Sequence, residues 1–195
     1  MNIKKLIIKT KWFPSAVYNK MLMKIRGISY GNNLTTYGTI FIRGKGTIKI
    51  GHNVMITSCR ETNPIGGDVK TILFTKNQGE IVIGDRTGIS NVSIVAMERV
   101  TIGSDVMIGA NCKLYDHDFH SIKLEERLMY PDPGVKSAPI EIKDGAFIGA
   151  HSIVLKGVTI GEKSVIGAGS VVTKSIPDGE IWAGNPCKFI RKIED

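Results

Sequence analysis

The chain has 195 residues, of which 42% are hydrophobic, 7% are aromatic and 22 are glycine. This length and apolar content are enough for one folded domain with a sizeable core. Scarce aromatic side chains and frequent glycine disfavour an ordinary β-sandwich or helical bundle, and they suit a fold with many tight turns. No apolar run reaches the roughly 18 residues that a membrane-spanning helix needs.

The net charge of +8 is concentrated at the N-terminal end of the chain. Residues 1–60 contain 11 Lys and Arg and no Asp or Glu, whereas the rest contains 15 basic and 18 acidic residues. Such a basic segment can face an anionic membrane or another polyanion, or it can be a solvated edge, and the sequence leaves both open. No motif of a nucleic-acid-binding protein accompanies the charge, so we expect no nucleic-acid partner.

The three cysteines, Cys59, Cys112 and Cys187, are far apart and include no CxxC pair. We therefore expect reduced thiols in a cytoplasmic protein, with neither a disulfide framework nor a zinc site. The apolar stretch within residues 1–11 is too short for a secretory signal peptide, and no small-residue cleavage site follows it.

Residues 1–30 are predicted to form a basic helical cap or arm. Within this segment, residues 15–26 read as one amphipathic helix, and Gly27 suits its end. The residues that share its apolar face are Val17, Met21, Leu22 and Ile25. The Lys-rich start before Pro14 is either a helix or a flexible arm. The helix can cap the domain that follows, as repeat domains require, or residues 1–26 can contact the inner face of an anionic membrane.

Residues 31–195 are predicted to form a repeat domain, because aliphatic residues recur at every sixth position. The clearest run is Ile142, Ile148, Val154, Ile160, Ile166 and Val172. Four residues after each aliphatic residue comes a small or β-branched one: Ala146, Ser152, Val158, Ser164 and Ser170. Glycine directly follows the aliphatic residue at Gly149, Gly161 and Gly167. The same pattern occurs over residues 83–95 and 102–114, and a weaker trace occurs over residues 50–56.

A period of six fits neither an amphipathic helix nor a meander of hairpins. It indicates a short strand and a tight turn, with the aliphatic side chain inward and glycine supplying the backbone angles of the turn. Three such units form a triangular coil, and stacked coils bury one another's inward faces. The sequence therefore predicts an all-β protein, a parallel β-helix that ends in a tail over residues 178–195.

The C-terminal part of the repeat resembles a known family. From Ile148 to Ile193 the chain reads IGAHSIVLKGVTIGEKSVIGAGSVVTKSIPDGEIWAGNPCKFIRKI. This segment resembles the hexapeptide-repeat acetyltransferases, above all the galactoside, maltose and cell-surface-polysaccharide O-acetyltransferases. The resemblance is specific over residues 80–195 and faint over residues 30–79. It implies a left-handed β-helix, acetyl-CoA as the acyl donor, a sugar or glycan acceptor, and a homotrimer with its sites between subunits.

The period fails between Leu114 and Ile142, which are 28 residues apart. A stacked prism accommodates such an insertion only by extruding it at a corner, so we predict an external loop over residues 115–141. Long loops of this kind in compact domains are usually functional.

The extruded loop contains the candidate catalytic residues. Acyl transfer to a hydroxyl needs a base, and histidine suits this role at neutral pH. His117 matches the catalytic histidine of the resembling family, with a gap of two residues, and His120 is the alternative base or an acceptor contact. Asp116 and Asp118 flank His117, and at most one of them is expected to orient its ring.

The resemblance also assigns residues to the thioester side. Ala150 matches the position whose backbone N–H points at the thioester carbonyl, where a donor stabilises an oxyanion. Gly149 precedes it, and Phe147 stands where the family often has Trp. The positions that match contacts to coenzyme A are Ala168 and Thr173 for pantetheine, and Lys174, Lys188 and Arg191 for the phosphates.

The acceptor side departs from galactoside acetyltransferases. Two polar acceptor contacts of that family fall on Ile89 and Met97, and Asn91 is the nearest polar residue. We expect O-acetylation of a sugar hydroxyl by direct attack, without an acyl-enzyme and without a metal. N-acetylation of an amino-sugar nucleotide, a zinc enzyme similar to γ-carbonic anhydrases using His117, His120 and His151, and a non-catalytic β-helix remain alternatives.

Overall fold

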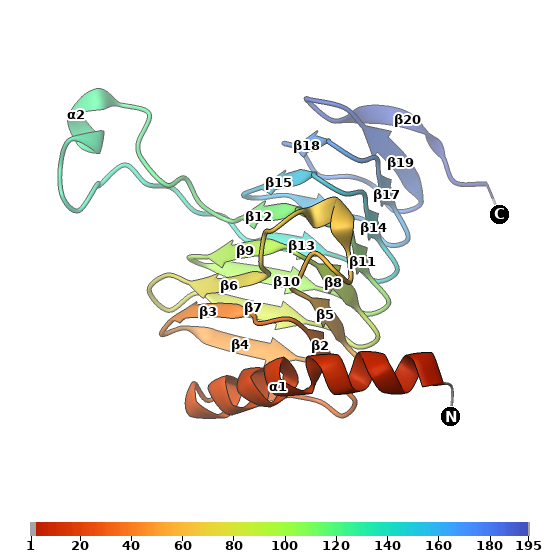
Figure 1. Ribbon diagram of the computed structural model, residues 1–195. Coiled ribbons are helices and arrows are strands. Elements are labelled where there is room, and N and C mark those ends of the chain that lie inside the picture. Colours follow the sequence, from red (N-terminus) through yellow and green to blue (C-terminus); the bar gives the residue numbers. More distant parts are fainter. Residues whose placement is uncertain (1–2, 195) are drawn as a thin grey trace.

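The computed structural model describes residues 3–194, which form a left-handed parallel β-helix with one long helix across its N-terminal end (Figure 1). Three parallel sheets make the sides of a triangular prism, and successive strands of the chain pass from sheet A to sheet B to sheet C. The predicted fold class is therefore confirmed. Residues 1 and 2 of the predicted N-terminal arm lie outside the described residues.

The strands of each sheet stack in chain order from one coil to the next. Sheet A contains β1 (Ser29–Tyr30), β4 (Thr47–Ile50), β7 (Glu80–Ile83), β10 (Arg99–Ile102), β13 (Ile140–Ile142) and β16 (Thr159–Ile160). Sheet B contains β2 (Thr35–Tyr37), β5 (Met55–Thr57), β8 (Gly88–Ser90), β11 (Met107–Ile108), β14 (Phe147–Ile148), β17 (Val165–Ile166), β19 (Glu180–Ala183) and β20 (Lys188–Lys192). Sheet C contains β3 (Phe41–Gly44), β6 (Ile72–Thr75), β9 (Ser93–Ala96), β12 (Lys113–Tyr115), β15 (Ile153–Leu155) and β18 (Val171–Val172).

The register keeps each inward position above its equivalent one coil away. In sheet B, for example, Ile89 pairs with Ile108, and Ile108 pairs with Ile148. All three side chains are buried in the single core that runs along the prism. Because a single coil cannot bury this face, stacking supplies the stability. At the C-terminal end β20 turns back and pairs antiparallel with β19, so the predicted tail is a hairpin that extends sheet B.

The glycine after each aliphatic residue has a different role from the one expected. Gly84 and Gly103 do not have positive φ angles, whereas Arg86 and Asp105, two residues further on, have φ of 57° each. A Cβ added at Gly84 would lie 2.5 Å from the carbonyl carbon of Gly103 in the next coil. Glycine is therefore required by the close approach of neighbouring coils, and the prediction that it supplies the turn angles was wrong.

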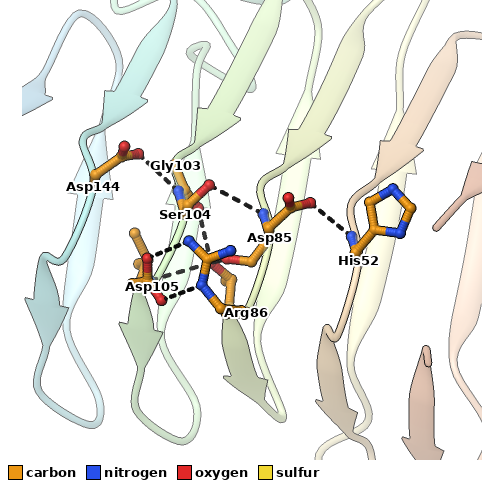
Figure 2. A network of polar contacts seen from close by, with 9 residues as sticks. His52, Asp85, Arg86, Gly103, Ser104, Asp105 and Asp144 are labelled. Carbon is orange, nitrogen blue, oxygen red and sulfur yellow. Dashed lines mark hydrogen bonds and ion pairs between the residues drawn. The ribbon is translucent and has the colours of Figure 1, made fainter. Parts of the chain in front are cut away.

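Polar side chains at the corner between sheets A and B tie one coil to the next. His52 N–H donates to Asp85 Oδ1 at 2.7 Å, Asp85 N–H to Ser104 Oγ at 3.2 Å, and Ser104 N–H to Asp144 Oδ1 at 2.8 Å (Figure 2). Each bond satisfies a backbone donor that the parallel strands leave unpaired at the corner. This ladder accounts for the polar residue that follows many of the close-packed glycines.

Helix α1 (Ile3–Ile25) covers the N-terminal end of the prism and continues through Pro14. Its buried contacts are Asn19 and Met23, both 0% exposed. The Asn19 amide donates to Thr36 Oγ1 at 3.0 Å and to the Gly38 carbonyl at 2.9 Å, and its oxygen accepts from Ile40 N–H at 3.0 Å. A polar side chain thus caps backbone groups of the first coil, which has no coil below it.

The predicted apolar face of this helix is not the buried one. Val17, Met21 and Ile25 are 49%, 55% and 74% exposed, and only Leu22 packs against the core. The helix does end as predicted, because Gly27 has a φ of 65° and Ile28 N–H bonds the Met23 carbonyl. Within residues 3–194 no helix is long and apolar enough to cross a membrane.

Two segments interrupt the winding. The first, residues 58–71, joins β5 to β6 and contains the short helix η1 (Pro64–Gly66). The second, residues 116–139, joins β12 to β13, contains α2 (Leu124–Arg127) and projects away from the prism (Figure 1). The second is the extruded loop predicted over residues 115–141. It is slightly shorter than predicted because Tyr115, Ile140 and Glu141 belong to strands.

Candidate functional site

The projecting loop is anchored at its root by His117. The residue forms an antiparallel bridge with Ser137. On either side of it, Ala138 N–H donates to the Asp116 carbonyl and Asp118 N–H donates to the Lys136 carbonyl, both at 2.9 Å. His117 therefore lies on a fixed piece of backbone at the corner between sheets C and A. It does not lie at the far end of the loop, near α2, which Figure 1 shows extending from the prism.

The imidazole of His117 is paired with the carboxylate of Asp116. His117 Nδ1 lies 2.9 Å from Asp116 Oδ1, and both side chains are 0% exposed. Asp116 is itself held by backbone donors of the preceding coil, Met97 N–H at 2.8 Å and Glu98 N–H at 2.7 Å. The carboxylate thus bridges two coils and fixes the plane of the histidine ring.

The Asp116 carboxylate is ionised at neutral pH. Burial alone would raise its pKa, but the hydrogen bonds from His117 and from the Met97 and Glu98 amides outweigh burial and hold the pKa below its ordinary value. An ionised carboxylate only accepts hydrogen bonds, so in the neutral imidazole of His117 the proton is on Nδ1 and Nε2 presents a lone pair. Nε2 is buried and has no hydrogen-bond partner in the structure. An orphaned buried acceptor on an oriented imidazole is the arrangement that a general base requires.

An aromatic side chain covers the histidine. The Phe119 ring lies 4.7 Å from the His117 ring and packs edge-on against Tyr115 at 5.1 Å, both measured between ring centroids. Lys76 Nζ lies 5.6 Å from the Phe119 centroid. The sequence reasoning missed this cover, although the alternation Tyr115, His117, Phe119 was a signal that three rings share one side of the extended backbone.

The other loop candidates point elsewhere. The carboxylate of Asp118 pairs with Lys156 Nζ at 2.5 Å, so it does not orient His117. His120 is largely exposed, and its Nδ1 lies 3.7 Å from Asp132. Asp132 in turn accepts from Ser121 N–H at 2.7 Å and has a lowered pKa chiefly because of that bond. These residues tie the loop to itself and to the prism.

The residues expected on the thioester side are divided between two corners of the prism. Ala150 and Ala168 lie one above the other at the corner between sheets B and C, where Gly169 N–H donates to the Ala150 carbonyl at 2.8 Å. A Cβ on Gly149 would lie 2.5 Å from Ala168 N, so the coils there pack too closely for a side chain. Thr173 and Lys174 are exposed and follow β18 at the corner where His117 also lies.

The remaining expected residues lie on sheet B. Phe147 is 45% exposed on the outer side of β14. Lys188 and Arg191 lie on β20, opposite Ala183 and Ile181, and both are exposed. None of these residues contacts His117 in the described chain. They form an exposed basic and aromatic surface at the C-terminal end of the sheet.

Asn91 is not part of the His117 cluster. It lies at the corner between sheets B and C, is 0% exposed, and donates its amide hydrogen bond to the Val69 carbonyl. Its side chain therefore holds the 58–71 segment at the same corner as Ala150, and its contact with an acceptor stays a prediction. Ile89, two positions earlier, is buried in the core, and Met97 takes part through its backbone amide alone.

Cys112 is buried in the core, beside the corner that carries Ala150. Burial raises the pKa of Cys112 to about 11, and its thiol donates to the Gly149 carbonyl at 3.1 Å. A thiol with so high a pKa is a poor nucleophile at neutral pH. Across residues 3–194 no three or more His, Cys, Asp or Glu side chains are grouped so as to hold a metal ion.

Comparison with known proteins agrees with the fold. A family model described as the hexapeptide repeat of succinyl-transferase matches residues 99–125 and 139–174, on both sides of the projecting loop. The matched residues thus belong to the hexapeptide repeat that forms the prism. The repeat continues beyond the matched residues, because the same coils extend down to β1.

The chain is similar to proteins named as acetyltransferases. It is 44% identical over 107 residues to a galactoside O-acetyltransferase of Escherichia coli, a match that covers 54% of this chain and 50% of that protein. The chain thus spans about half the length of the curated relatives it matches.

Two solved structures are similar over more of the chain. One is a variant of the Bacillus cereus N-acyltransferase AntD in complex with dTDP-4-amino-4,6-dideoxyglucose and coenzyme A, with 26% identity and a TM-score of 0.70 over 90% of this chain and 89% of that one. The other is a Vibrio cholerae hexapeptide-repeat acetyltransferase complexed with acetyl coenzyme A, with 25% identity and a TM-score of 0.56 over 84% of this chain and 73% of that one.

Proposed function

We propose that this protein transfers an acetyl group from acetyl-CoA to a hydroxyl group of a sugar or glycan precursor, with His117 as the general base. The observation that carries the proposal is the buried His117–Asp116 pair, which leaves Nε2 unprotonated and without a partner. A hydroxyl of the acceptor donates its hydrogen bond to Nε2. As the oxygen attacks the thioester carbonyl, the proton moves to Nε2, and Asp116 stabilises the imidazolium that forms.

The collapse of the tetrahedral intermediate breaks the C–S bond. The thiolate of coenzyme A leaves and takes up the proton from His117, which returns the base to its starting state. The backbone N–H of Ala150 is the proposed donor to the oxyanion. The raised pKa of Cys112 and its place in the core support direct attack by the acceptor, without an acyl-enzyme.

The site needs a second copy of the chain. Ala150 lies at one edge of sheet C and His117 at the other. Residues 110 and 117 of the preceding coil mark the same two edges, and strand β12 (Lys113–Tyr115) with its flanking turns lies between them. A thioester held at Ala150 therefore cannot reach His117 of the same chain. We propose a homotrimer in which the Ala150 edge of one copy meets the His117 edge of its neighbour, with Thr173, Lys174, Lys188 and Arg191 available to coenzyme A.

The chemistry of the acceptor has one competing candidate. The similarity to the galactoside O-acetyltransferase favours a hydroxyl, whereas the AntD variant was solved with an amino-sugar nucleotide, which favours an amine. An unprotonated Nε2 can accept a proton from either group. We favour the hydroxyl because the sequence identity to the O-acetyltransferase, 44%, is higher than the 26% identity to the AntD variant.

Mass spectrometry on a panel of acceptors tests the proposal. The purified chain is incubated with acetyl-CoA and with free sugars, glycan fragments, sugar nucleotides and amino-sugar nucleotides. The proposal predicts an acceptor that gains one acetyl group, and the product is an ester that mild alkali cleaves. An alkali-stable amide establishes the N-acetyl alternative. No acetylated product from any class, together with no binding of coenzyme A, would reject an acetyltransferase.

A further inference from the structure

The two faces of helix α1 have different surroundings. The face with Asn19 and Met23 is buried against the first coil. The opposite face carries four large apolar side chains spaced four residues apart, which is the spacing of one helical stripe. These are Phe13, Val17, Met21 and Ile25, and they are 66%, 49%, 55% and 74% exposed. Because the helix already caps the prism with its other face, the cap does not account for this stripe.

Cations border the apolar stripe. A shallow groove between α1 and β1 is lined by Val17, Met21, Ile28 and Tyr30 together with Lys20 and Lys24. Both lysines are exposed, and neither has an acidic partner in residues 1–60, which contain no Asp or Glu. Arg26, at the end of the helix, donates to the Gly44 carbonyl at 3.2 Å. The base of the prism thus combines an apolar strip with uncompensated positive charge.

We propose that this stripe of α1 docks on an anionic lipid bilayer, with Phe13, Val17, Met21 and Ile25 at the level of the acyl chains and Lys20 and Lys24 among the headgroups. A helix with an apolar face bordered by lysines binds in the membrane interface, because the apolar side chains are buried among the acyl chains and the lysines are attracted to anionic headgroups. A second copy of the chain fits the stripe poorly, because its own α1 would bring Lys20 and Lys24 against their equivalents without an acidic residue to compensate them.

Docking by α1 fixes how the protein stands on the membrane. Since α1 lies across the end of the prism, the coils stack away from the lipid surface (Figure 1). His117 follows β12, which is three strands above β3 in sheet C. With strands about 4.8 Å apart, the base stands roughly 15 Å above the first coil. The side chains that dock are distinct from those of the acyl-transfer site, so membrane binding is measurable without any activity.

Flotation with lipid vesicles tests the proposal. The full chain is mixed with phosphatidylcholine vesicles, or with vesicles in which about one third of the lipid is phosphatidylglycerol. We expect the protein to float with the anionic vesicles only. Lys20→Glu with Lys24→Glu is expected to lower the affinity at least about 25-fold, because each cation contributes about fivefold. Val17→Ser with Met21→Ser is expected to lower it about tenfold or more.

Matched substitutions far from α1 serve as controls. Lys163→Glu with Lys192→Glu makes the same change of charge on exposed residues of the later coils, and Ile190→Ser removes an apolar side chain that is 57% exposed on β20. These controls are expected to bind vesicles as the unaltered chain does. Circular dichroism confirms that all variants fold, which is expected because the substituted side chains are exposed.

Four results would overturn the proposal. The first is no flotation with anionic vesicles, and the second is equal affinity for both vesicle types. The third is a change of molecular mass in sedimentation equilibrium when Val17 and Met21 become serine, because that change would show a second copy on the stripe. Vesicle binding that resists both α1 variants would also overturn it.

Discussion

Replacing Asp116 with asparagine exchanges one oxygen of the buried carboxylate for an NH2 group of the same size. Oδ1 of Asp116 accepts from Met97 N–H and faces His117 Nδ1, and Oδ2 accepts from Glu98 N–H. In one orientation of asparagine, the NH2 group faces Glu98 N–H, and this backbone donor loses its acceptor. In the other orientation, the NH2 group faces Met97 N–H and donates to Nδ1, so the proton of His117 moves to Nε2.

Both orientations have a measurable consequence. A buried donor without an acceptor costs about 1–3 kcal/mol, so we expect Asp116→Asn to lower the free energy of unfolding by that amount. The second orientation also removes the base, because a protonated Nε2 of a neutral imidazole cannot accept a proton. Turnover is expected to fall by about 10²–10⁴, the range that general-base catalysis contributes. The affinity for coenzyme A is expected to stay unchanged.

The loss of stability depends on pH in a defined direction. The folded-state pKa of Asp116 lies below the value near 3.9 that an aspartate has in an unfolded chain. Its carboxylate therefore stabilises the fold fully at pH values above about 4, and this contribution is lost as the pH falls through the lower folded-state pKa. The stability difference between the unaltered chain and Asp116→Asn is expected to be constant near neutral pH and to shrink in acid.

Urea unfolding at a series of pH values measures this difference, and release of free coenzyme A thiol with an active acceptor measures turnover. Asp118→Asn is the matched control, because Asp118 pairs with Lys156 and not with His117. The reasoning is refuted if Asp116→Asn keeps turnover within about threefold of that of the unaltered chain and also keeps its full stability. A stability difference that grows on acidification would refute the assigned pKa direction.

Three further predictions follow from the geometry. Gly84→Ala is expected to lower the free energy of unfolding by about 1–3 kcal/mol, measured by thermal or urea unfolding, because its Cβ would lie 2.5 Å from Gly103 C. Gly88→Ala, with open space around the new Cβ, is the control and is expected to change the stability little. Equal effects of the two variants would contradict the close-packing role of Gly84. Diethylpyrocarbonate is expected to modify the exposed His120 before the buried His117, and Phe119→Ala is expected to increase the rate at which His117 is modified. An unchanged rate in this variant would show that Phe119 does not cover His117. His117→Ala and Ala168→Trp are each expected to be inactive alone, and mixing the two variants is expected to restore part of the activity in mixed assemblies. If mixed assemblies form and no activity returns, the site is not shared between copies.

The period of six predicted the prism because inward positions cannot vary. Ile142, Ile148 and Val154 all point into the narrow core inside the prism, so each of these positions must be aliphatic. This requirement is visible in the sequence as the period of six. The break after Leu114 predicted the extruded loop for the same reason. The 58–71 segment escaped prediction because its neighbours, over residues 50–56, carry only a weak trace of the repeat.

The misread features depend on contacts between coils. The role of glycine was assigned to the turn it stands in, but Gly84 is required by Gly103, 19 positions later, and no local pattern shows such a contact. The face of α1 was assigned from its apolar stripe, but the end of a β-helix presents unpaired backbone groups, and Asn19 meets them. An assignment from the hydrophobic pattern selects the apolar face of a helix, so it fails where the buried face carries a polar side chain.

The histidine and its loop were predictable, whereas their surroundings were not. His117 was predicted as the base because it stands in the segment that breaks the period, and its role stays a prediction. Asp116 and Asp118 could not be told apart, since neighbours in sequence point in different directions, and only the Met97 and Glu98 amides of the preceding coil decide between them. The separation of Ala150 from His117 follows from the three-sided winding.

The role of His117 is tested most directly by the rate at which His117→Ala releases thiol from acetyl-CoA in the presence of an acceptor that the unaltered chain acetylates. Coenzyme A binding, measured by calorimetry on the same preparation, separates a lost base from a lost fold. We predict a fall in turnover of at least about 10²-fold with unchanged affinity for coenzyme A. Turnover close to that of the unaltered chain would contradict the assignment of His117 as the base.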